Sequence, residues 1–261
     1  MKARLDKTAK SSFDSLGRHI GTAHLPIARV SLTHKETTKP LQAGGMRKET
    51  ERDMDANTKK RNKLLGQMVV EGLKSRNMNA CYVATKDEAL SKALEFIKEG
   101  STVSIGGCQS AHEVGLVKAL QDGDYNFLGH GSMDPRAELL AAYDSDVFIT
   151  SANAMTDDGI IVNIDGNSNR VSCIAQGPKQ VLFIVGMNKV CPDLDSAMKR
   201  ARNVAAPTNA QRFDLTTPCK SKGKCFDCKC MDTICCQFLI TRFSRHEGRI
   251  NVIMVGEDLG Y

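Results

Sequence analysis

Short apolar strands that alternate with amphipathic helices limit the fold of this chain more than any other feature. The run VLFIVG at 181–186 is apolar throughout, which is typical of a strand buried on both faces of a sheet. Further strands are expected at 80–85, 101–105, 125–128, 146–151, 159–165, 237–243 and 249–256, and helices at 55–77, 86–100, 110–122, 134–143 and 193–206. This order predicts an α/β fold with a mainly parallel sheet, helices on both faces, and closing C-terminal strands that form a hairpin or an edge.

Short polar residues mark where several of these helices begin. Thr85 with Glu88, and Ser110 with Glu113, have the spacing of a capping box. In such a box an N-cap hydroxyl and an acidic side chain three residues later satisfy free N–H groups of the first turn. The helix at 193–206 is expected to stop before Pro207, because a proline disrupts the interior of a helix.

Residues 1–53 differ from the rest and are expected to be a basic tail. The first 60 residues hold 13 Lys and Arg against 7 Asp and Glu, which accounts for the whole net charge of +6. Three explanations stay open: a disordered extension, read-through upstream of a start at Met46 or Met54, and an organelle transit peptide. The folded domain is expected to cover residues 54–261, including a cysteine-rich loop at 217–236.

Composition argues against several functions. A neutral folded domain with few aromatic residues and no tryptophan does not suit nucleic-acid binding. No apolar run approaches the roughly 20 residues that cross a bilayer, so no membrane partner is expected. The N-terminus lacks the apolar stretch of a secretory signal. We therefore expect a cytoplasmic protein whose thiols stay reduced.

Two glycines stand between a predicted strand and a predicted helix in TVSIGGCQSAHE. Gly106 and Gly107 let the backbone approach a ligand closely, and the helix N-terminus that follows favours an anion. Ser110 and Glu113 follow within about one turn, at the carboxyl edge where open α/β sheets bind ligands. A tight turn with a capping box and no ligand would select the same residues, so both interpretations stay open.

Short polar side chains gather after the next strands, in SANAMTDDGIIVNIDGNSNRV. The candidate ligand-binding residues of this stretch are Ser151, Asn153, Asp165, Gly166, Asn169 and Arg170. Ser151 and Asn153 follow a strand end directly, and Arg170 has the forked guanidinium that grips a carboxylate or a phosphate. Ordinary turn chemistry accounts for the same residue types. Together with the glycine turn, their density favours a site for a small anionic metabolite.

Six of the chain's ten cysteines lie in TPCKSKGKCFDCKCMDTICC at 217–236. Without a secretory signal, these thiols favour metal or redox chemistry over structural disulfide bonds. The two residues between Cys225 and Cys228 let a tight turn aim both sulfurs at one metal ion. A reduced loop without metal, or one disulfide bond formed on oxidation, is the competing interpretation.

Several of these segments occur in the same order in one known family. STVSIGG, TSANAMTDDGIIVNIDGNSNRV, GPKQVLFIVGMNKV, AAPTNAQR and TPCKSKGKCFDC resemble LUD-domain (lactate-utilization) proteins over roughly residues 55–261. The resemblance implies the fold shared by glucosamine-6-phosphate deaminase, ribose-5-phosphate isomerase and CoA transferases. Relatives are linked to L-lactate oxidation through iron–sulfur partner proteins. The chain is similar to the branch that has a cysteine-rich C-terminal segment.

The resemblance also implies a set of metal ligands. Relatives in this branch have cysteines that match Cys219, Cys225, Cys228 and Cys235. Four thiolates suffice for a [4Fe–4S] cluster or for a tetrahedral zinc ion. The irregular spacing and the iron–sulfur partners of the family favour the cluster, with zinc as the alternative. Cys230 and Cys236 are extra thiols.

Three functions remain in competition at this point. The first is a redox-associated protein that binds a small anionic metabolite or cofactor, carries the metal or iron–sulfur centre, and passes electrons to an iron–sulfur electron-transfer protein. The second is an isomerase-like or CoA-transferase-like enzyme in which zinc is structural. The third is a non-catalytic redox-sensing or assembly module. The resemblance carries over no catalytic residue, so whether the chain is an enzyme stays open.

Overall fold

The computed structural model describes residues 54–131 and 133–261. The basic tail predicted at 1–53 lies outside the described residues. Over the described part of the chain, no helix is long and apolar enough to cross a membrane.

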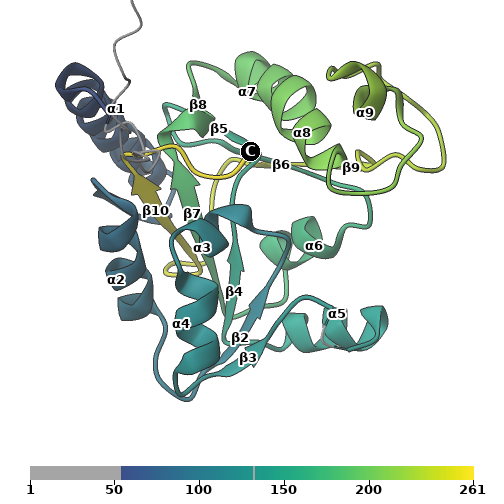
Figure 1. Cartoon of the computed structure of the whole chain (residues 1–261). Coiled ribbons are helices and arrows are strands. Elements are labelled where there is room, and N and C mark those ends of the chain that lie inside the picture. Colours follow the sequence, from purple (N-terminus) through teal and green to yellow (C-terminus); the bar gives the residue numbers. More distant parts are fainter. Residues whose placement is uncertain (1–53, 132) are drawn as a thin grey trace, which may run out of the picture. The chain divides into compact units, whose positions relative to one another are not determined.

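The centre of the domain is a parallel sheet of six strands (Figure 1). Its order across the sheet is β1 (Asn79–Val83), β10 (Ile250–Val255), β7 (Gln180–Gly186), β4 (Val147–Thr150), β2 (Thr102–Ile105) and β3 (Asn126–Leu128). Every neighbouring pair in this sheet is parallel. The predicted α/β fold with a mainly parallel sheet is therefore confirmed.

The last two strands lie apart, which corrects the expectation that they could close the domain as a hairpin. β10 lies inside the main sheet, between β1 and β7. β9 (Gln237–Thr241) instead pairs antiparallel with β6 (Ile161–Asp165) at the edge of a second sheet. The two strands differ accordingly in burial: INVIMV is buried at all six positions, whereas QFLIT is largely exposed.

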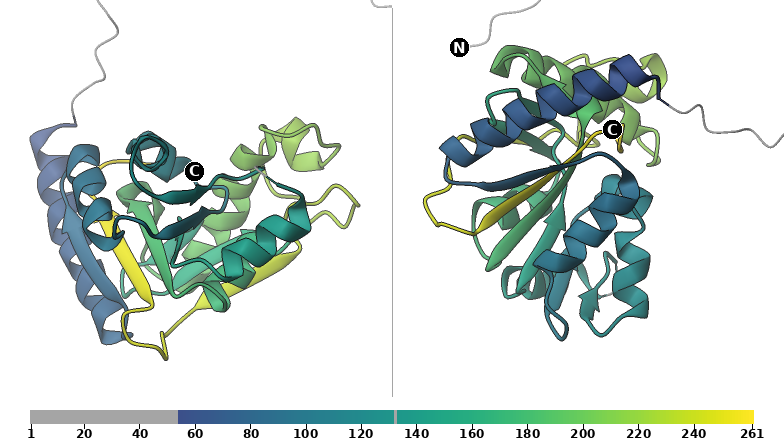
Figure 2. Two further views of the ribbon diagram at one scale, coloured as in Figure 1. Left: turned by 90° about the horizontal axis from the view of Figure 1, so that it is seen from below. Right: turned by 90° about the vertical axis from the view of Figure 1, so that its left-hand side faces the viewer.

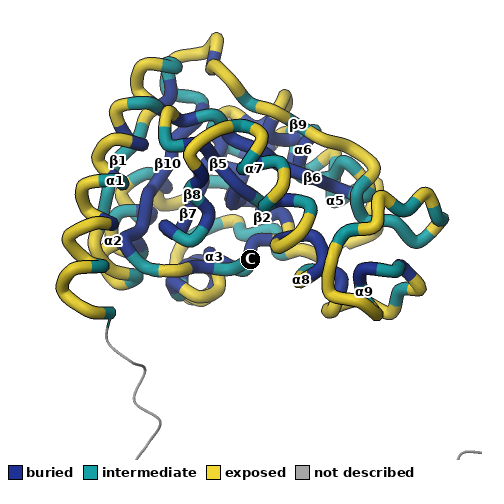
Figure 3. The backbone as a smooth tube through the Cα atoms, turned by 90° about the horizontal axis from the view of Figure 1, so that it is seen from above, coloured by how far each residue is buried: buried dark blue, intermediate teal, exposed yellow. Residues whose placement is uncertain are grey.

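Helices cover both faces of the main sheet, as predicted, and Figure 2 shows the two groups from two further sides. One face packs against α1 (Ala56–Ser75), α5 (Pro135–Tyr143) and α6 (Asn169–Ala175). The other face packs against α2 (Lys86–Phe96), α3 (Gln109–Glu113) and α4 (Leu116–Asp122). In Figure 3 the strands between them are the most buried part of the chain.

β7 shows how one apolar run serves two cores. Side chains alternate across a strand, so Val181, Phe183 and Val185 belong to the core on the α1 face. Leu182 and Ile184 belong to the core on the α2 face. All five are almost fully buried. Each such side chain contributes about 1.5–3 kcal/mol of hydrophobic free energy, so neither face tolerates a polar residue.

A smaller second sheet lies beside the main one and has its own apolar cluster. Its order is β8 (Val190–Cys191), β5 (Ala154–Thr156), β6 and β9. A short 3-10 helix, η1 (Met187–Lys189), joins β7 of the main sheet to β8 of the second sheet. Ala154, Val162 and Ile164 of this sheet pack against Ala197 and Ala201. The second sheet is therefore held to the helix that follows β8.

That helix runs through Pro207, which corrects the expectation that it stops before this residue. It consists of α7 (Leu194–Arg200), a π-helix η2 (Ala201–Ala205) and α8 (Ala206–Ala210). The N–H of Ala206 donates to the carbonyl of Ala201, five residues earlier. Proline lacks an N–H and crowds the carbonyl four residues before it, and the wider π turn accommodates both. The helix can therefore continue to Ala210.

Candidate functional site

A buried lysine lies where three neighbouring strands end. Lys189, on η1 after β7, is only 3% exposed. Its ammonium nitrogen is 2.9 Å from the hydroxyl of Ser151, directly after β4, and 3.2 Å from the hydroxyl of Ser110, after β2. Ser151 in turn donates to the carbonyl of Ile184 at 2.6 Å. We call Lys189, Ser110 and Ser151 the lysine site.

The charge of the lysine site is unbalanced. The pKa of Lys189 is lowered to about 8, mainly by burial; Cys108 and Glu113 oppose this shift, while the positive charges of Arg200 and Arg170 add to it. Among the described residues, the hydrogen bonds of the Lys189 amine go to hydroxyl groups and not to a carboxylate. Burial also raises the pKa of the neighbouring Cys108 thiol, so that thiol stays protonated near neutral pH.

Ser110 and Glu113 do not form the predicted capping box. α3 begins after Cys108, which makes no side-chain cap bond, so Ser110 lies inside the helix. Its hydroxyl points to the lysine site, where it donates to Ser151 at 3.3 Å. The Glu113 carboxylate accepts the backbone N–H of Gly260 at 2.8 Å. The contacts of the folded chain therefore take both side chains away from the helix start.

The two glycines of the predicted turn have different surroundings. A Cβ at Gly106 would lie 2.5 Å from Cγ of Arg170 and 3.0 Å from the ring of Phe148. The absence of a side chain at this position makes room for the Arg170 stem. A Cβ at Gly107 would meet nothing within 4 Å, and this residue is exposed at the mouth of the turn.

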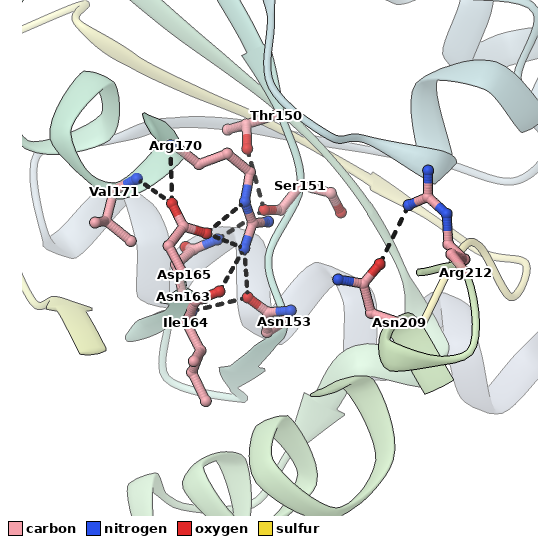
Figure 4. A network of polar contacts seen from close by, with 10 residues as sticks. All are labelled: Thr150, Ser151, Asn153, Asn163, Ile164, Asp165, Arg170, Val171, Asn209 and Arg212. Atoms are coloured by element: carbon pink, nitrogen blue, oxygen red, sulfur yellow. Dashed lines mark hydrogen bonds and ion pairs between the residues drawn. The ribbon is translucent and has the colours of Figure 1, made fainter. Parts of the chain in front are cut away.

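Arg170 and Asp165 point at each other in a polar network that Figure 4 shows from close by. The Arg170 guanidinium donates to the Asp165 carboxylate at 2.7 and 2.8 Å and to the Asn153 side chain at 2.9 Å. The other Asp165 oxygen accepts the N–H groups of Arg170 and Val171 at the start of α6. Much of the hydrogen-bonding capacity of Arg170 is thus satisfied within the chain. Its predicted role in gripping an anion stays a prediction.

A second arginine reaches the same region from α7. Arg200 donates to the backbone carbonyls of Asn188 at 2.8 Å and Asn153 at 2.5 Å. Carbonyl groups orient a guanidinium without neutralising it, and burial lowers the pKa of Arg200. Lys189 and Arg200 therefore place two positive charges at the carboxyl edge of the main sheet, beside the ion pair of Arg170 with Asp165.

The C-terminal residues lie over the lysine site. The side chain of Asn188 exchanges hydrogen bonds with the backbone of Leu259 and Gly260. A Cβ at Gly260 would lie 3.0 Å from the Ser110 hydroxyl and 3.3 Å from the Lys189 amine. Figure 1 shows the C-terminal end next to the upper ends of the strands. This segment excludes solvent from the lysine.

The four cysteines that the family resemblance selects come together in the structure. Cys219 lies on α9 (Pro218–Lys222), and the other three lie in the loop that follows. The pKa of Cys235 is raised to about 11, mainly by burial, with smaller contributions from Cys225, Cys219 and Cys228. The four thiols are therefore near enough to influence one another electrostatically. We call these four residues the cysteine cluster.

The cysteine cluster has the donors of a metal site but not its closed geometry. Arg202 donates to the sulfur of Cys225 at 3.5 Å, as the backbone N–H of Asp227 does at 3.4 Å. Such donors suit a sulfur that carries negative charge. Within residues 54–131 and 133–261, however, no three His, Cys, Asp or Glu side chains are arranged to hold a metal ion. The identity of the predicted centre, cluster or zinc, stays a prediction.

The end of the cysteine-rich loop is bonded to the turn after β6. The N–H of Cys236 donates to the carbonyl of Asp165 at 2.8 Å. A Cβ at Gly166 would lie 3.1 Å from Cα of Ile234, so the loop packs closely against this turn. Gly166 therefore has a packing role. Asn169 is the first residue of α6, directly before Arg170.

Sequence reasoning did not identify Lys189, Arg200 or Asn188. Asn188 and Lys189 in GMNKVCPD, and Arg200 in DSAMKRAR, have polar side chains that are typical of surface residues. A signal was present nevertheless, because VLFIVG ends in a glycine just as STVSIGG does. Residues that follow such a strand end should meet at the same edge of the sheet.

A family model described as "LUD domain" matches residues 66–255. A duf162 family protein from Deinococcus radiodurans has a solved structure that is 11% identical, with a TM-score of 0.46, covering 74% of this chain and 97% of that one. The structure of eIF2B beta from Chaetomium thermophilum is 19% identical, with a TM-score of 0.34, over 43% of this chain and 44% of that one. No curated protein matches the chain.

Proposed function

The chain belongs to the LUD-domain family, and on that premise we propose that it binds a small anionic metabolite through Lys189 and a metal or [4Fe–4S] centre through the cysteine cluster. In this proposal the protein takes part in a redox process through that centre. The observation that carries the proposal is the buried amine of Lys189, which is bonded to two hydroxyls and surrounded by further positive charge.

An anion would complete this arrangement. Burying an ammonium group is unfavourable unless an opposite charge accompanies it. Arg200 raises that free energy further, since like charges repel, whereas Glu113 opposes it and Arg170 is paired with Asp165. A carboxylate or phosphate at the lysine site would accept bonds from the amine and reduce the repulsion between Lys189 and Arg200. The C-terminal segment covers the lysine, which favours a small metabolite over a macromolecule.

The cysteine cluster supports the second half of the proposal. Cys235 is surrounded by three other thiols, so their thiolates would repel one another without a cation between them. A metal ion reverses this effect, because it favours the deprotonated form of each ligand. A [4Fe–4S] cluster at Cys219, Cys225, Cys228 and Cys235 would supply one-electron transfer when bound. Zinc is the alternative and would brace the loop.

The partner we propose is an iron–sulfur electron-transfer protein. This part of the proposal rests on the family resemblance, together with the position of the cysteine-rich loop. The loop is largely exposed in Figure 3, and Cys236 and Met231 within it face solvent. A redox centre at such a place is within reach of a second protein.

A second candidate is an isomerase-like or CoA-transferase-like enzyme with a structural zinc. The bond between the Cys236 N–H and the Asp165 carbonyl favours it. A metal in the cysteine cluster would then stabilise the turn that holds Arg170 without touching the ligand. In this case zinc is bound, and loss of zinc lowers the stability of the chain before it lowers anion binding.

Two measurements test the proposal. Isothermal titration of the protein with oxalate and with inorganic phosphate should show binding that Lys189→Met weakens at least tenfold, about 1.4 kcal/mol. Lys179→Met is the matched control, because Lys179 is exposed and forms a surface ion pair with Asp146. Binding that is absent, or equal in both variants, contradicts the anion site. Metal analysis and the absorbance of protein purified without oxygen then separate the cluster from zinc.

A further inference from the structure

The two hydroxyls of the lysine site fix the direction of the Lys189 amine. The Ser151 hydroxyl donates its proton to the carbonyl of Ile184. The Ser151 oxygen can therefore only accept a hydrogen bond from Lys189. Ser110 is the second acceptor. A neutral amine has two N–H bonds, and each donates a hydrogen bond to one of these two serine oxygens. The lone pair of the nitrogen is then left pointing away from both serines.

A neutral lysine with an oriented lone pair is a nucleophile. Lysine amines activated by burial or by nearby cations react with carbonyl groups. Both conditions hold here, because Lys189 is 3% exposed and lies near Arg200 and Arg170. We propose that Lys189 is a covalent catalytic residue that forms an imine with the carbonyl carbon of a small aldehyde or ketone bearing an anionic group. This inference rests on the anion site of the proposed function.

The charges around the lysine define the class of compound. The hydrogen bonds of Arg200 go to backbone carbonyls, so its charge can act on an anionic group next to the reacting carbonyl, against the opposing charge of Asp258. A carboxylate and a phosphate share this chemistry. An uncharged aldehyde gains no electrostatic attraction from these positive charges, so it should react poorly.

The reaction balances without an oxidant or a reductant. The nitrogen lone pair of Lys189 attacks the carbonyl carbon, a C–N bond forms, and the C=O electron pair moves to the oxygen, which takes up a proton. The nitrogen loses its protons and the hydroxyl leaves as water, so that amine and carbonyl give imine and water. Each of the two protons that the nitrogen loses is taken up by the departing oxygen, while Ser110 and Ser151 hold the amine in position for the attack through its two N–H bonds.

The C-terminal segment makes the site selective. Gly260 lies against the lysine site, and Asn188 and Glu113 hold its backbone there. A covered imine is protected from hydrolysis and from competing nucleophiles. A substituent at position 260 would come within 3.3 Å of the amine and 3.0 Å of the Ser110 hydroxyl, so glycine allows the C-terminal segment to cover the amine closely.

Reductive trapping of the wild-type protein tests the proposal. The protein is incubated with sodium cyanoborohydride and one of three probes: glyoxylate, glycolaldehyde phosphate or acetaldehyde. Hydride reduction fixes any imine as a stable secondary amine, and peptide mass mapping locates it. We expect Lys189 to be labelled by glyoxylate or glycolaldehyde phosphate at least tenfold faster than exposed Lys179, and only slowly by acetaldehyde. The two anionic probes distinguish a carboxylate from a phosphate. Excess oxalate should protect Lys189.

The outcomes separate this inference from the proposed function. If oxalate binds and Lys189→Met abolishes that binding, yet neither anionic probe labels Lys189 faster than Lys179, the covalent role is wrong and the anion site stands. If oxalate and phosphate do not bind and no label appears, both are wrong. Lys189→Arg is the further variant, since it keeps the charge but cannot form an imine. It should retain oxalate binding and yield no labelled residue at position 189, and wild-type labelling decides the matter if this variant fails to fold.

Discussion

The backbone N–H of Cys236 lies 2.8 Å from the carbonyl oxygen of Asp165, and this bond joins the cysteine-rich loop to the turn that carries Arg170. Arg170 in turn packs over Gly106 at the end of β2. A continuous series of contacts therefore runs from the cysteine cluster to the carboxyl edge of the main sheet. Changes at either end should be measurable at the other.

We predict that Cys235→Ser and Cys236→Ser behave differently. Cys235 is half-buried and surrounded by three other thiols, whereas Cys236 is exposed. Cys235→Ser should reduce the bound iron or zinc to roughly a tenth of the wild-type content or less, because it removes a ligand. Cys236→Ser should leave the metal content unchanged. Metal analysis of anaerobically purified protein makes the comparison, and equal metal content in the two variants contradicts the assignment.

Lys189→Met should not destabilise the protein. Methionine has a similar volume, and the hydroxyls of Ser110 and Ser151 keep acceptors in Ser151 and Ile184. Replacing a buried charge with a well-packed apolar group is neutral or stabilising by about 1–4 kcal/mol. Urea unfolding at pH 7 measures the change. The exposed Lys179→Met should stay within about 1 kcal/mol of wild type, and a large loss of stability in Lys189→Met would show a structural lysine.

Stability should depend on pH through Lys189 in a defined direction. The pKa of Lys189 is about 8 in the folded protein, against 10.5 when exposed. Between these values the unfolded chain binds the proton that the folded chain has lost, so the lysine contribution to stability rises from pH 8 to 10.5. The full shift corresponds to roughly 3 kcal/mol.

The neighbouring groups define the control for that pH experiment. Arg170, Arg200, Glu113 and Cys108 all act on Lys189. The pKa of Cys108 is raised above 9.0 by burial, so its contribution falls as pH rises above that value and opposes the lysine. The difference between wild type and Lys189→Met, each unfolded in urea across this range, isolates the lysine. A difference that does not change with pH contradicts the assignment.

Asp165→Asn should destabilise the protein by about 3 kcal/mol, because it leaves the buried Arg170 guanidinium without its counter-charge. The two N–H groups at the start of α6 also lose a charged acceptor. Asp124→Asn is the control at an exposed carboxylate. The midpoint of urea unfolding reports both variants. Similar unfolding midpoints for Asp165→Asn and Asp124→Asn would contradict the role of Asp165 in organising the turn after β6.

Gly106→Ala and Gly107→Ala form a matched pair on adjacent residues. A methyl group at Gly106 would lie 2.5 Å from Cγ of Arg170, whereas one at Gly107 meets nothing within 4 Å. We expect Gly106→Ala to cost about 1–3 kcal/mol through overpacking. Gly107→Ala should change stability by no more than about 0.5 kcal/mol. Equal effects in thermal unfolding would contradict the packing of Arg170 on Gly106.

The apolar runs determined much of the fold in advance because burial depends on local composition. VLFIVG was recognisable as a strand buried on both faces, and β7 has that position. Local composition does not determine which strands become neighbours in the sheet. The run INVIMV shows that β10 is buried, but its place between β1 and β7 depends on residues far away in the chain.

The candidate site likewise combines residues that local sequence could place with residues whose position depends on distant parts of the chain. Ser151 and Gly106 could be placed at the carboxyl edge of the sheet because each directly follows a strand. Lys189 could not, because its burial is produced by β2, β4 and the C-terminal residues together. Ser110 was misassigned as a helix cap for the same reason. Its sequence spacing suits a cap, but in the folded chain the hydroxyl contacts Ser151 and Lys189, which are distant in sequence.

The position of β10 has a consequence for synthesis on the ribosome. Asn79 of β1 pairs with Asn251 of β10, 172 residues later, and β10 is the last described strand to be made. Until it emerges, β1 and β7 of the nascent chain each have an open edge that can pair with another polypeptide. Translation must also reach Gly260 before the lysine is enclosed. Protection of this chain during its own synthesis, by a chaperone or by slow elongation, therefore matters most at its final strand.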